Sequence, residues 1–223
     1  GDLREYLGME HCRAFWTRLF PVEGDKMITN RRRPILTLMA SFQVQEEGLS
    51  HQEPMPEGLP PPEAVTPDNE VRRINAHRFP QAWHGALFAD RAIDIRSLEA
   101  PRWLDPTPAE PVNHCWVRTI APIDDDPRLH RAMLAYVSDM ALMPTAQMQH
   151  GRSSFTGDVL DASLDHAMWF HEPFRMDDWL LYQTRSGWSG HGRGFIQGRI
   201  WTRDGRLVAS VAQEGMMRIP RPR

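Results

Sequence analysis

The spacing of hydrophobic and polar residues changes along the chain. Between residues 2 and 20 the apolar side chains fall roughly on one helical face, which predicts a helix over part of that range. Residues 34–44 form an apolar run typical of a largely buried strand. Residues 46–70 are rich in proline, glutamate and glycine, which predicts a loop or linker across the surface. A short helix is expected within residues 71–90.

The middle of the chain alternates between strand and helix patterns. Residues 88–96 and 113–120 have the pattern of strands, and a proline-rich loop separates them. Asp126 suits the cap of a helix that has Pro127 in its first turn. This helix should run to about residue 141, before Pro144 stops it. Its predicted apolar stripe consists of Leu129, Ala132, Met133, Tyr136, Val137 and Met140.

Strands joined by turns are expected after this helix, over residues 164–171, 180–189, 194–202 and 207–216. Asp204 and Gly205 suit the last turn, because both residue types tolerate positive φ angles. Residues 190–194 are glycine-rich but lack the spacing of a dinucleotide-binding loop, so a tight turn is expected there. The order of strand, long helix and successive strands predicts an α+β fold in which a sheet wraps around its own helix.

The composition of the 223-residue chain is ordinary for a globular protein, with 41% hydrophobic and 25% charged residues. Its length suits one large domain or two small ones. The formal net charge of −3 indicates no general attraction to nucleic acid, so no nucleic-acid partner is expected. The chain has no run of about 18 apolar residues and no signal-peptide pattern in its first residues, so no membrane span or membrane partner is expected.

The cysteines and histidines restrict the possible chemistry further. Cys12 and Cys115 are too few and too far apart for a disulfide framework, so we expect reduced thiols and a cytoplasmic protein. No Cys-x-x-Cys or His-x-x-x-His pair occurs, so neither a metal site nor a cofactor is expected. The positive charge is almost all arginine, which would suit a phosphate-bearing ligand but is explained more simply by genome composition.

Three polar residues occupy positions that suit chemistry. Asp139 borders the apolar stripe in the last turn of the predicted helix, Ser163 precedes a strand, and Gln213 interrupts an apolar strand. Each also has a structural explanation, as a surface carboxylate, a turn residue and an amide bonded to backbone respectively. Asp165 and His166 look like part of a Ser/His/Asp triad, but adjacent strand residues point to opposite faces, so we discount them.

Three segments together resemble the acyl-CoA thioesterase II family, the double hotdog thioesterases. They are Ala-Tyr-Val-Ser-Asp at 135–139, Ala-Ser-Leu-Asp-His-Ala-Met-Trp-Phe-His at 162–171, and Val-Ala-Ser-Val-Ala-Gln-Glu-Gly-Met-Met-Arg at 208–218. The resemblance is strong over residues 88–218, fair over 34–52 and absent before Arg31. It implies a double hotdog fold with an incomplete or divergent first half. The implied division is a partial N-terminal hotdog at 1–45, a linker at 46–87 and a C-terminal hotdog at 88–223.

The same resemblance implies a reaction and its residues. The expected enzyme hydrolyses the thioester of fatty acyl-CoA to free acid and CoA, with Asp139, Ser163 and Gln213 as the catalytic residues that hold and activate a water. A homodimer or higher homo-oligomer is expected. The alternatives are a hotdog that binds acyl-CoA or another lipid without turnover and, less well matched, a hotdog hydratase. The acyl pocket should depend on the packing of Met140, Leu142, Met168 and Trp169.

Overall fold

The computed structural model describes residues 13–19, 36–89 and 91–220, in two compact units, Gly1–His51 and Gln52–Arg223. In the first unit β1 (Arg13–Leu19) and β2 (Leu36–Phe42) pair antiparallel. The helix predicted within residues 2–20 is therefore wrong over β1, because cross-strand hydrogen bonds take the place of helical ones. The strand at β2 is confirmed, but its predicted burial is wrong, since Met39 and Phe42 are 64% and 59% exposed.

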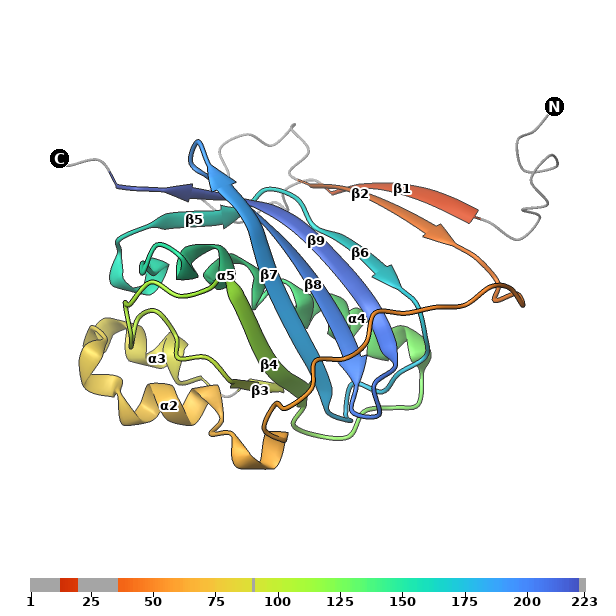
Figure 1. Cartoon of the computed structure of the whole chain (residues 1–223), viewed down its shortest axis with the longest axis horizontal. Coiled ribbons are helices and arrows are strands. Elements are labelled where there is room, and N and C mark those ends of the chain that lie inside the picture. Colours follow the sequence, from red (N-terminus) through yellow and green to blue (C-terminus); the bar gives the residue numbers. More distant parts are fainter. Residues whose placement is uncertain (1–12, 20–35, 90, 221–223) are drawn as a thin grey trace. The chain divides into compact units, whose positions relative to one another are not determined.

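The second unit is built around one antiparallel sheet with the strand order β3-β4-β7-β8-β9-β5, and β6 also pairs with β9. Figure 1 shows the helices α4 (Pro127–Ser138) and α5 (Leu142–Met148) behind the central strands of this sheet. A sheet curled around a helix confirms the predicted α+β hotdog architecture for this unit. The strands are β3 (Ile93–Ser97), β4 (Val112–Thr119), β5 (Leu160–Ser163), β6 (Ala167–Phe170), β7 (Leu180–Gly190), β8 (Arg193–Thr202) and β9 (Leu207–Arg218).

Helix α4 begins as the sequence predicts. The Asp126 side chain accepts a hydrogen bond from the Arg128 backbone N–H at 2.9 Å, and Pro127 occupies the first turn. The helix ends at Ser138, and α5 follows after a short break. The prediction that Pro144 ends the helical region is wrong. Pro144 lies in the first turn of α5, where its missing N–H has no intrahelical partner to lose.

The buried face of α4 differs from the predicted stripe. Leu129, Ala132 and Tyr136, all expected to be buried, are exposed. Hydropathy failed here because two polar residues face inward and find partners: the His130 Nδ1 accepts from the Met176 backbone N–H at 2.9 Å, and Ser138 lies against the sheet. The buried residues of α4 are His130, Leu134, Val137 and Ser138.

The strand predicted over residues 164–171 is confirmed only as the shorter β6 at 167–170, and a bulge separates it from β5, which ends at Ser163. Ser163 of β5 lies opposite Gly215 of β9, whereas Ala167 of β6 lies opposite Ala212. Four steps along the edge thus oppose three along β9, which leaves one extra residue. The bulge turns the backbone around residue 166, so a side-chain direction deduced from a straight strand does not apply there.

The turns of the β7–β8–β9 meander follow the glycine pattern. His191 and Gly192 have φ angles of 52° and 75°, as a two-residue hairpin requires, so the tight turn expected at 190–194 is confirmed. Gly205, at φ 90°, supplies the positive φ angle between β8 and β9. Asp204 was also expected to have a positive φ angle, but it does not.

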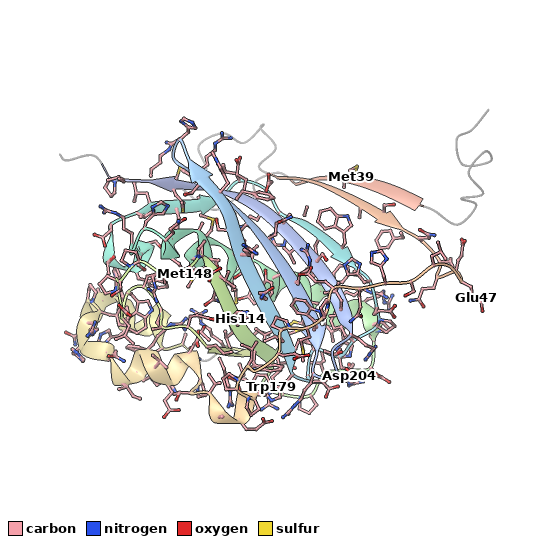
Figure 2. The ribbon with its side chains drawn as sticks, in the orientation of Figure 1. Met39, Glu47, His114, Met148, Trp179 and Asp204 are labelled. Carbon is pink, nitrogen blue, oxygen red and sulfur yellow. The ribbon has the colours of Figure 1, made fainter. Side chains whose placement is uncertain are left out.

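The outer face of the sheet carries its own apolar cluster of Trp116, Trp179, Leu181 and Trp201. Met55 and Leu59, from the predicted linker, pack on this cluster. Figure 1 shows this segment crossing in front of the strands, and Figure 2 labels Trp179 near their lower end. The segment continues into η1 (Pro62–Ala64), α2 (Asp68–Ile74), η2 (Ala76–Arg78), η3 (Gln81–Trp83) and α3 (His84–Leu87). The predicted linker is therefore an irregular but packed cover, and the helix expected within 71–90 is confirmed as short pieces.

Close packing of α5 on the sheet depends on a glycine of β8. A methyl group at Gly194 would lie 2.8 Å from Ala146 Cβ of α5, so the helix or the strand would have to move. We expect Gly194→Ala to lower the free energy of unfolding by about 1–3 kcal/mol, measured by urea unfolding. Gly187→Ala in β7 is the matched control, because nothing lies within 4 Å of its added methyl. Equal stability of the two variants would contradict the packing argument.

Candidate functional site

The three residues singled out in the sequence come from three separate elements. Asp139 is the C-cap residue directly after α4, Ser163 is the last residue of β5, and Gln213 lies in the middle of β9. The Ser163 hydroxyl donates to Asp139 Oδ1 at 3.0 Å, and the Gln213 amide Nε2 donates to Ser163 Oγ at 3.0 Å. The fold thus brings the three predicted residues into one hydrogen-bonded chain.

His166 extends this chain on the far side of Gln213. Its Nδ1 lies 2.6 Å from Gln213 Oε1, and its Nε2 lies 2.9 Å from Ser138 Oγ. A straight strand would point His166 and Asp165 to opposite faces, but the bulge between β5 and β6 means that the strand is not straight there. The nearness of His166 to Ser163 in the sequence was the available signal, and the hydroxyl of Ser138 gave none.

Asp165 has a different position from its neighbour. Its carboxylate accepts from the Glu214 backbone N–H at 2.7 Å, on β9. The Ser163 hydroxyl donates to Asp139 and not to His166, so Ser163, His166 and Asp165 do not form a triad. This geometry agrees with the expectation that Asp165 and His166 are not half of a Ser/His/Asp triad. The reason differs, because the backbone between β5 and β6 is bulged and not a straight strand.

The direction of each hydrogen bond follows from the proton count. A carboxylate oxygen only accepts, and a serine hydroxyl has one proton, which Ser163 gives to Asp139. Ser163 must then accept from a donor, so the Gln213 amide presents its Nε2 to the serine and its Oε1 to His166. The second carboxylate oxygen of Asp139 has no hydrogen-bond partner among the described residues, which leaves it able to accept from a water molecule.

Burial divides the site into a fixed part and an accessible part. Gln213 and Ser138 are 0% exposed, whereas Asp139, Ser163 and His166 reach the surface. The Tyr182 hydroxyl donates to the Ser138 backbone carbonyl at 2.7 Å. Burial raises the pKa of Tyr182 well above its usual value, so this hydroxyl keeps its proton and remains a donor. The accessible Asp139 and Ser163 are therefore backed by the buried Gln213 and Ser138.

A profile of the family described as acyl-CoA thioesterase matches residues 88–216, more than half of the chain. The chain belongs to the acyl-CoA thioesterase family. The matched residues include all members of the hydrogen-bonded chain from Ser138 to Gln213, and the resemblance stated from the sequence is confirmed. A hotdog-fold protein from Alicyclobacillus acidocaldarius has a TM-score of 0.66 over 95% of this chain and 69% of its own, at 19% identity, which supports the fold alone.

Other members of the acyl-CoA thioesterase family match most of this chain. Acyl-coenzyme A thioesterase 8 of Mus musculus is 37% identical over 208 residues, which are 90% of this chain and 64% of that protein. Acyl-CoA thioesterase 2 of Haemophilus influenzae is 31% identical over 84% of this chain and 65% of its own. The structure of an acyl-CoA thioesterase II from Mycobacterium marinum is 34% identical, with a TM-score of 0.65 over 93% of this chain and 73% of that one. The chain spans less than two thirds of these two curated relatives.

Exposed apolar side chains occur along the sheet edge that carries Ser163 in this thioesterase-family chain. Leu160, Leu164, Trp169 and Phe170, all on or next to β5 and β6, are exposed. Single exposed apolar residues are common, but four within eleven consecutive residues give this edge of the sheet an apolar margin. Such a margin suits contact with an apolar ligand or another protein surface.

A cavity of about 660 Å³ lies between α2, the loop at 98–104 and the start of α5. Of the four residues expected to shape an acyl pocket, Met140 alone lines this cavity. Leu142 is fully buried in the core, Met168 is partly buried against it, and Trp169 is exposed on the sheet edge. The four residues therefore do not line this cavity together.

Asp68 lies in the wall of this cavity, and the pKa of its carboxyl is raised. Its carboxylate accepts from the Ser97 backbone N–H at 2.8 Å and hydroxyl at 2.9 Å. Burial raises the pKa of Asp68 despite these bonds and the nearby Arg72. A carboxyl whose pKa is raised on folding stabilises the fold when protonated, and this stabilisation is lost as the pH rises through the folded pKa.

We therefore expect Asp68→Asn, which mimics the protonated carboxyl, to have little effect on the free energy of unfolding at acidic pH. As the pH rises toward neutral, the variant should become more stable relative to the natural chain. Urea unfolding of both proteins across this pH range measures the difference. A difference that stays constant with pH would contradict the raised pKa of Asp68.

Within residues 13–19, 36–89 and 91–220, no group of three or more His, Cys, Asp or Glu side chains is arranged to hold a metal ion. No helix in the same ranges is long and apolar enough to cross a bilayer.

Proposed function

We propose that this chain hydrolyses the thioester of fatty acyl-CoA to a free acid and CoA. The observation that carries the proposal is the hydrogen-bonded chain from Gln213 through Ser163 to Asp139, which ends on an accessible carboxylate. In the proposed reaction, Asp139 takes a proton from a water held beside it as the water oxygen attacks the thioester carbon. The tetrahedral intermediate collapses, the C–S bond breaks, and the proton passes to the CoA thiolate.

The supporting residues have a defined part in this proposal. Ser163 fixes one oxygen of Asp139, so the other oxygen is directed to the water. Gln213 is buried and orients the serine hydroxyl without titrating itself. Direct attack by water needs no covalent acyl-enzyme, and the Ser163 hydroxyl, which bonds to Asp139 and not to His166, supports that route. The names of the related thioesterases from mouse and Haemophilus influenzae add support for the substrate class.

The proposal is tested by incubating the purified chain with acyl-CoA of several chain lengths and measuring free thiol. We expect enzyme-dependent thiol release that saturates with substrate for at least one chain length. The alternative is a hotdog that binds acyl-CoA without turnover, which the partial coverage of the relatives motivates. Saturable binding without thiol release at any chain length would favour this alternative and reject the hydrolase.

We also propose that the chain forms a homodimer or a higher homo-oligomer. The support is the exposed apolar margin along β5 and β6, together with the outer edges of these strands, which pair only with β9 among the described residues. Light scattering coupled to size-exclusion chromatography should give a mass of at least two chains, and a monomer at all concentrations would contradict it. A cytoplasmic location also remains a proposal, with which the free, buried Cys115 is compatible.

A further inference from the structure

We infer that His166 is a positioning residue that fixes the amide of Gln213 and, through it, the Ser163 hydroxyl that faces Asp139. The kinetic part of this inference rests on the proposed hydrolysis, while its structural part does not. Four contacts carry it, from Ser138 to His166, Gln213, Ser163 and Asp139, each between 2.6 and 3.0 Å. Without His166, the Ser163 hydroxyl would no longer be held toward Asp139.

The tautomer of His166 follows from the partner of its Nδ1. The Gln213 Oε1 is an amide oxygen and can only accept, so the Nδ1 at 2.6 Å must carry a proton. A histidine with a bare Nδ1 would face this oxygen with a lone pair, and the amide would be driven to rotate. The rotated amide would present its oxygen to Ser163 in place of its N–H. Ser163 would then lose its donor or turn its proton away from Asp139.

The other ring nitrogen is held by a buried hydroxyl. Ser138 Oγ lies 2.9 Å from His166 Nε2 and 2.8 Å from the Ala135 backbone carbonyl. With neutral His166 the hydroxyl donates to Nε2, and with charged His166 it accepts from Nε2 and donates to the carbonyl. Both protonation states of the ring therefore keep the proton on Nδ1 that Gln213 requires. Ser138 is fully buried, so it gives the ring a fixed second attachment point.

The backbone that carries His166 is clamped to β9. The Leu164 and Asp165 N–H groups both point to the Glu214 backbone carbonyl, at 2.9 and 3.4 Å, and the Asp165 carboxylate accepts from the Glu214 N–H. These contacts tie the two residues before His166 to the N–H and the carbonyl of Glu214. The ring is thus placed before any ligand arrives, which is what a positioning group requires. Asp165 thus has a structural role, one residue away from the hydrogen-bonded chain.

Removing the ring should affect geometry more than stability. His166 is exposed, so its loss opens no cavity in the core, whereas Gln213 is fully buried and would be left with an unpaired oxygen. The amide can relieve this by rotating, at the cost of its bond to Ser163. A small displacement of a group beside the reacting atoms commonly costs about 10- to 100-fold in rate. We therefore expect the loss to be in kcat and not in substrate binding.

The kinetic test compares substitutions that restore one ring nitrogen at a time. His166→Ala should lower kcat by about 10- to 100-fold with little change in KM. His166→Asn places an N–H near the Nδ1 position and should recover much of the loss, whereas His166→Gln places its amide near Nε2 and should not. His171→Ala is the matched control, because His171 also bonds a serine, Ser210, at 2.8 Å but lies outside the chain of contacts. Unchanged kcat in His166→Ala, or equal recovery by both amides, would overturn the inference.

A second readout is independent of turnover. Long-range proton–nitrogen NMR of the imidazole rings, with His166→Ala to identify the signal, should show His166 protonated at Nδ1. The signal should change in Gln213→Leu, which removes the acceptor. A neutral His166 protonated only at Nε2 would reject the inference even if the chain hydrolyses acyl-CoA. Conversely, an Nδ1-protonated ring in a chain that releases no thiol would reject the proposed function and leave the positioning of Gln213 supported.

Discussion

Replacing Asp139 with asparagine should lower kcat for acyl-CoA hydrolysis by about 10²- to 10⁴-fold, the range typical of a lost general base. Asparagine keeps the size of the side chain, and its Oδ1 still accepts from the Ser163 hydroxyl. What it loses is the ability to take a proton from the attacking water. Because Asp139 is exposed and bonds to Ser163 alone among the described side chains, the fold should be unaffected.

Thiol release and urea unfolding, measured on the same preparations, separate the two effects. Asp178→Asn is the matched control, since Asp178 is an exposed carboxylate just before β7, at a cavity that does not include Asp139. We expect the control to retain both activity and stability. If Asp139→Asn hydrolyses acyl-CoA as fast as the natural chain, Asp139 is not the base. If it loses both activity and cooperative unfolding, the loss of rate cannot be assigned to the base.

The largest effect on stability is expected from Trp201→Ala, at about 3–5 kcal/mol. Trp201 is 0% exposed and packs with Trp116 and Leu181 on the outer face of the sheet. Its indole N–H donates to the Glu53 backbone carbonyl at 3.1 Å, so it also anchors the irregular segment that covers this face. The substitution would leave a cavity under that segment and remove one of its attachments.

Two measurements test this prediction. Urea unfolding should give the loss of free energy, and limited proteolysis should cut the segment at 52–62 faster than in the natural chain. Trp188→Ala is the matched control, because Trp188 is 44% exposed near the end of β7 and should cost far less. Trp201→Phe keeps most of the apolar volume and should fall between them, since it loses only the hydrogen bond and part of the packing. A loss no greater than that of Trp188→Ala would contradict the covering role.

Local patterns correctly predicted the elements that depend on residues close together in the sequence. The start of α4 at Asp126 and Pro127 is confirmed, as are the strands that became β4, β7, β8 and β9. These succeed because capping and alternation depend on residues a few positions apart. The three candidate site residues were also chosen from the sequence, with the family resemblance, and they meet in space. The division at 1–45, 46–87 and 88–223 stays a prediction.

Other features were beyond local patterns. Helical spacing misled at β1, whose backbone partner β2 lies about twenty residues further along the chain. Pro144 suits the end of a helix by local rules, but it lies in the first turn of α5. The packed cover over Trp201 looked like an exposed linker, because its partners lie about 150 residues away.

The sequence by itself determined the α+β order, the apolar strands and helix, and the residue types available for chemistry. The tertiary structure alone decided the bulge between β5 and β6 and therefore the place of His166 beside Gln213. The physical reason is that one extra residue in a strand is defined only against its partner, and β9 lies about fifty residues away. Periodicity along the chain records which face is buried, but register between distant strands depends on backbone hydrogen bonds that form only in the folded sheet.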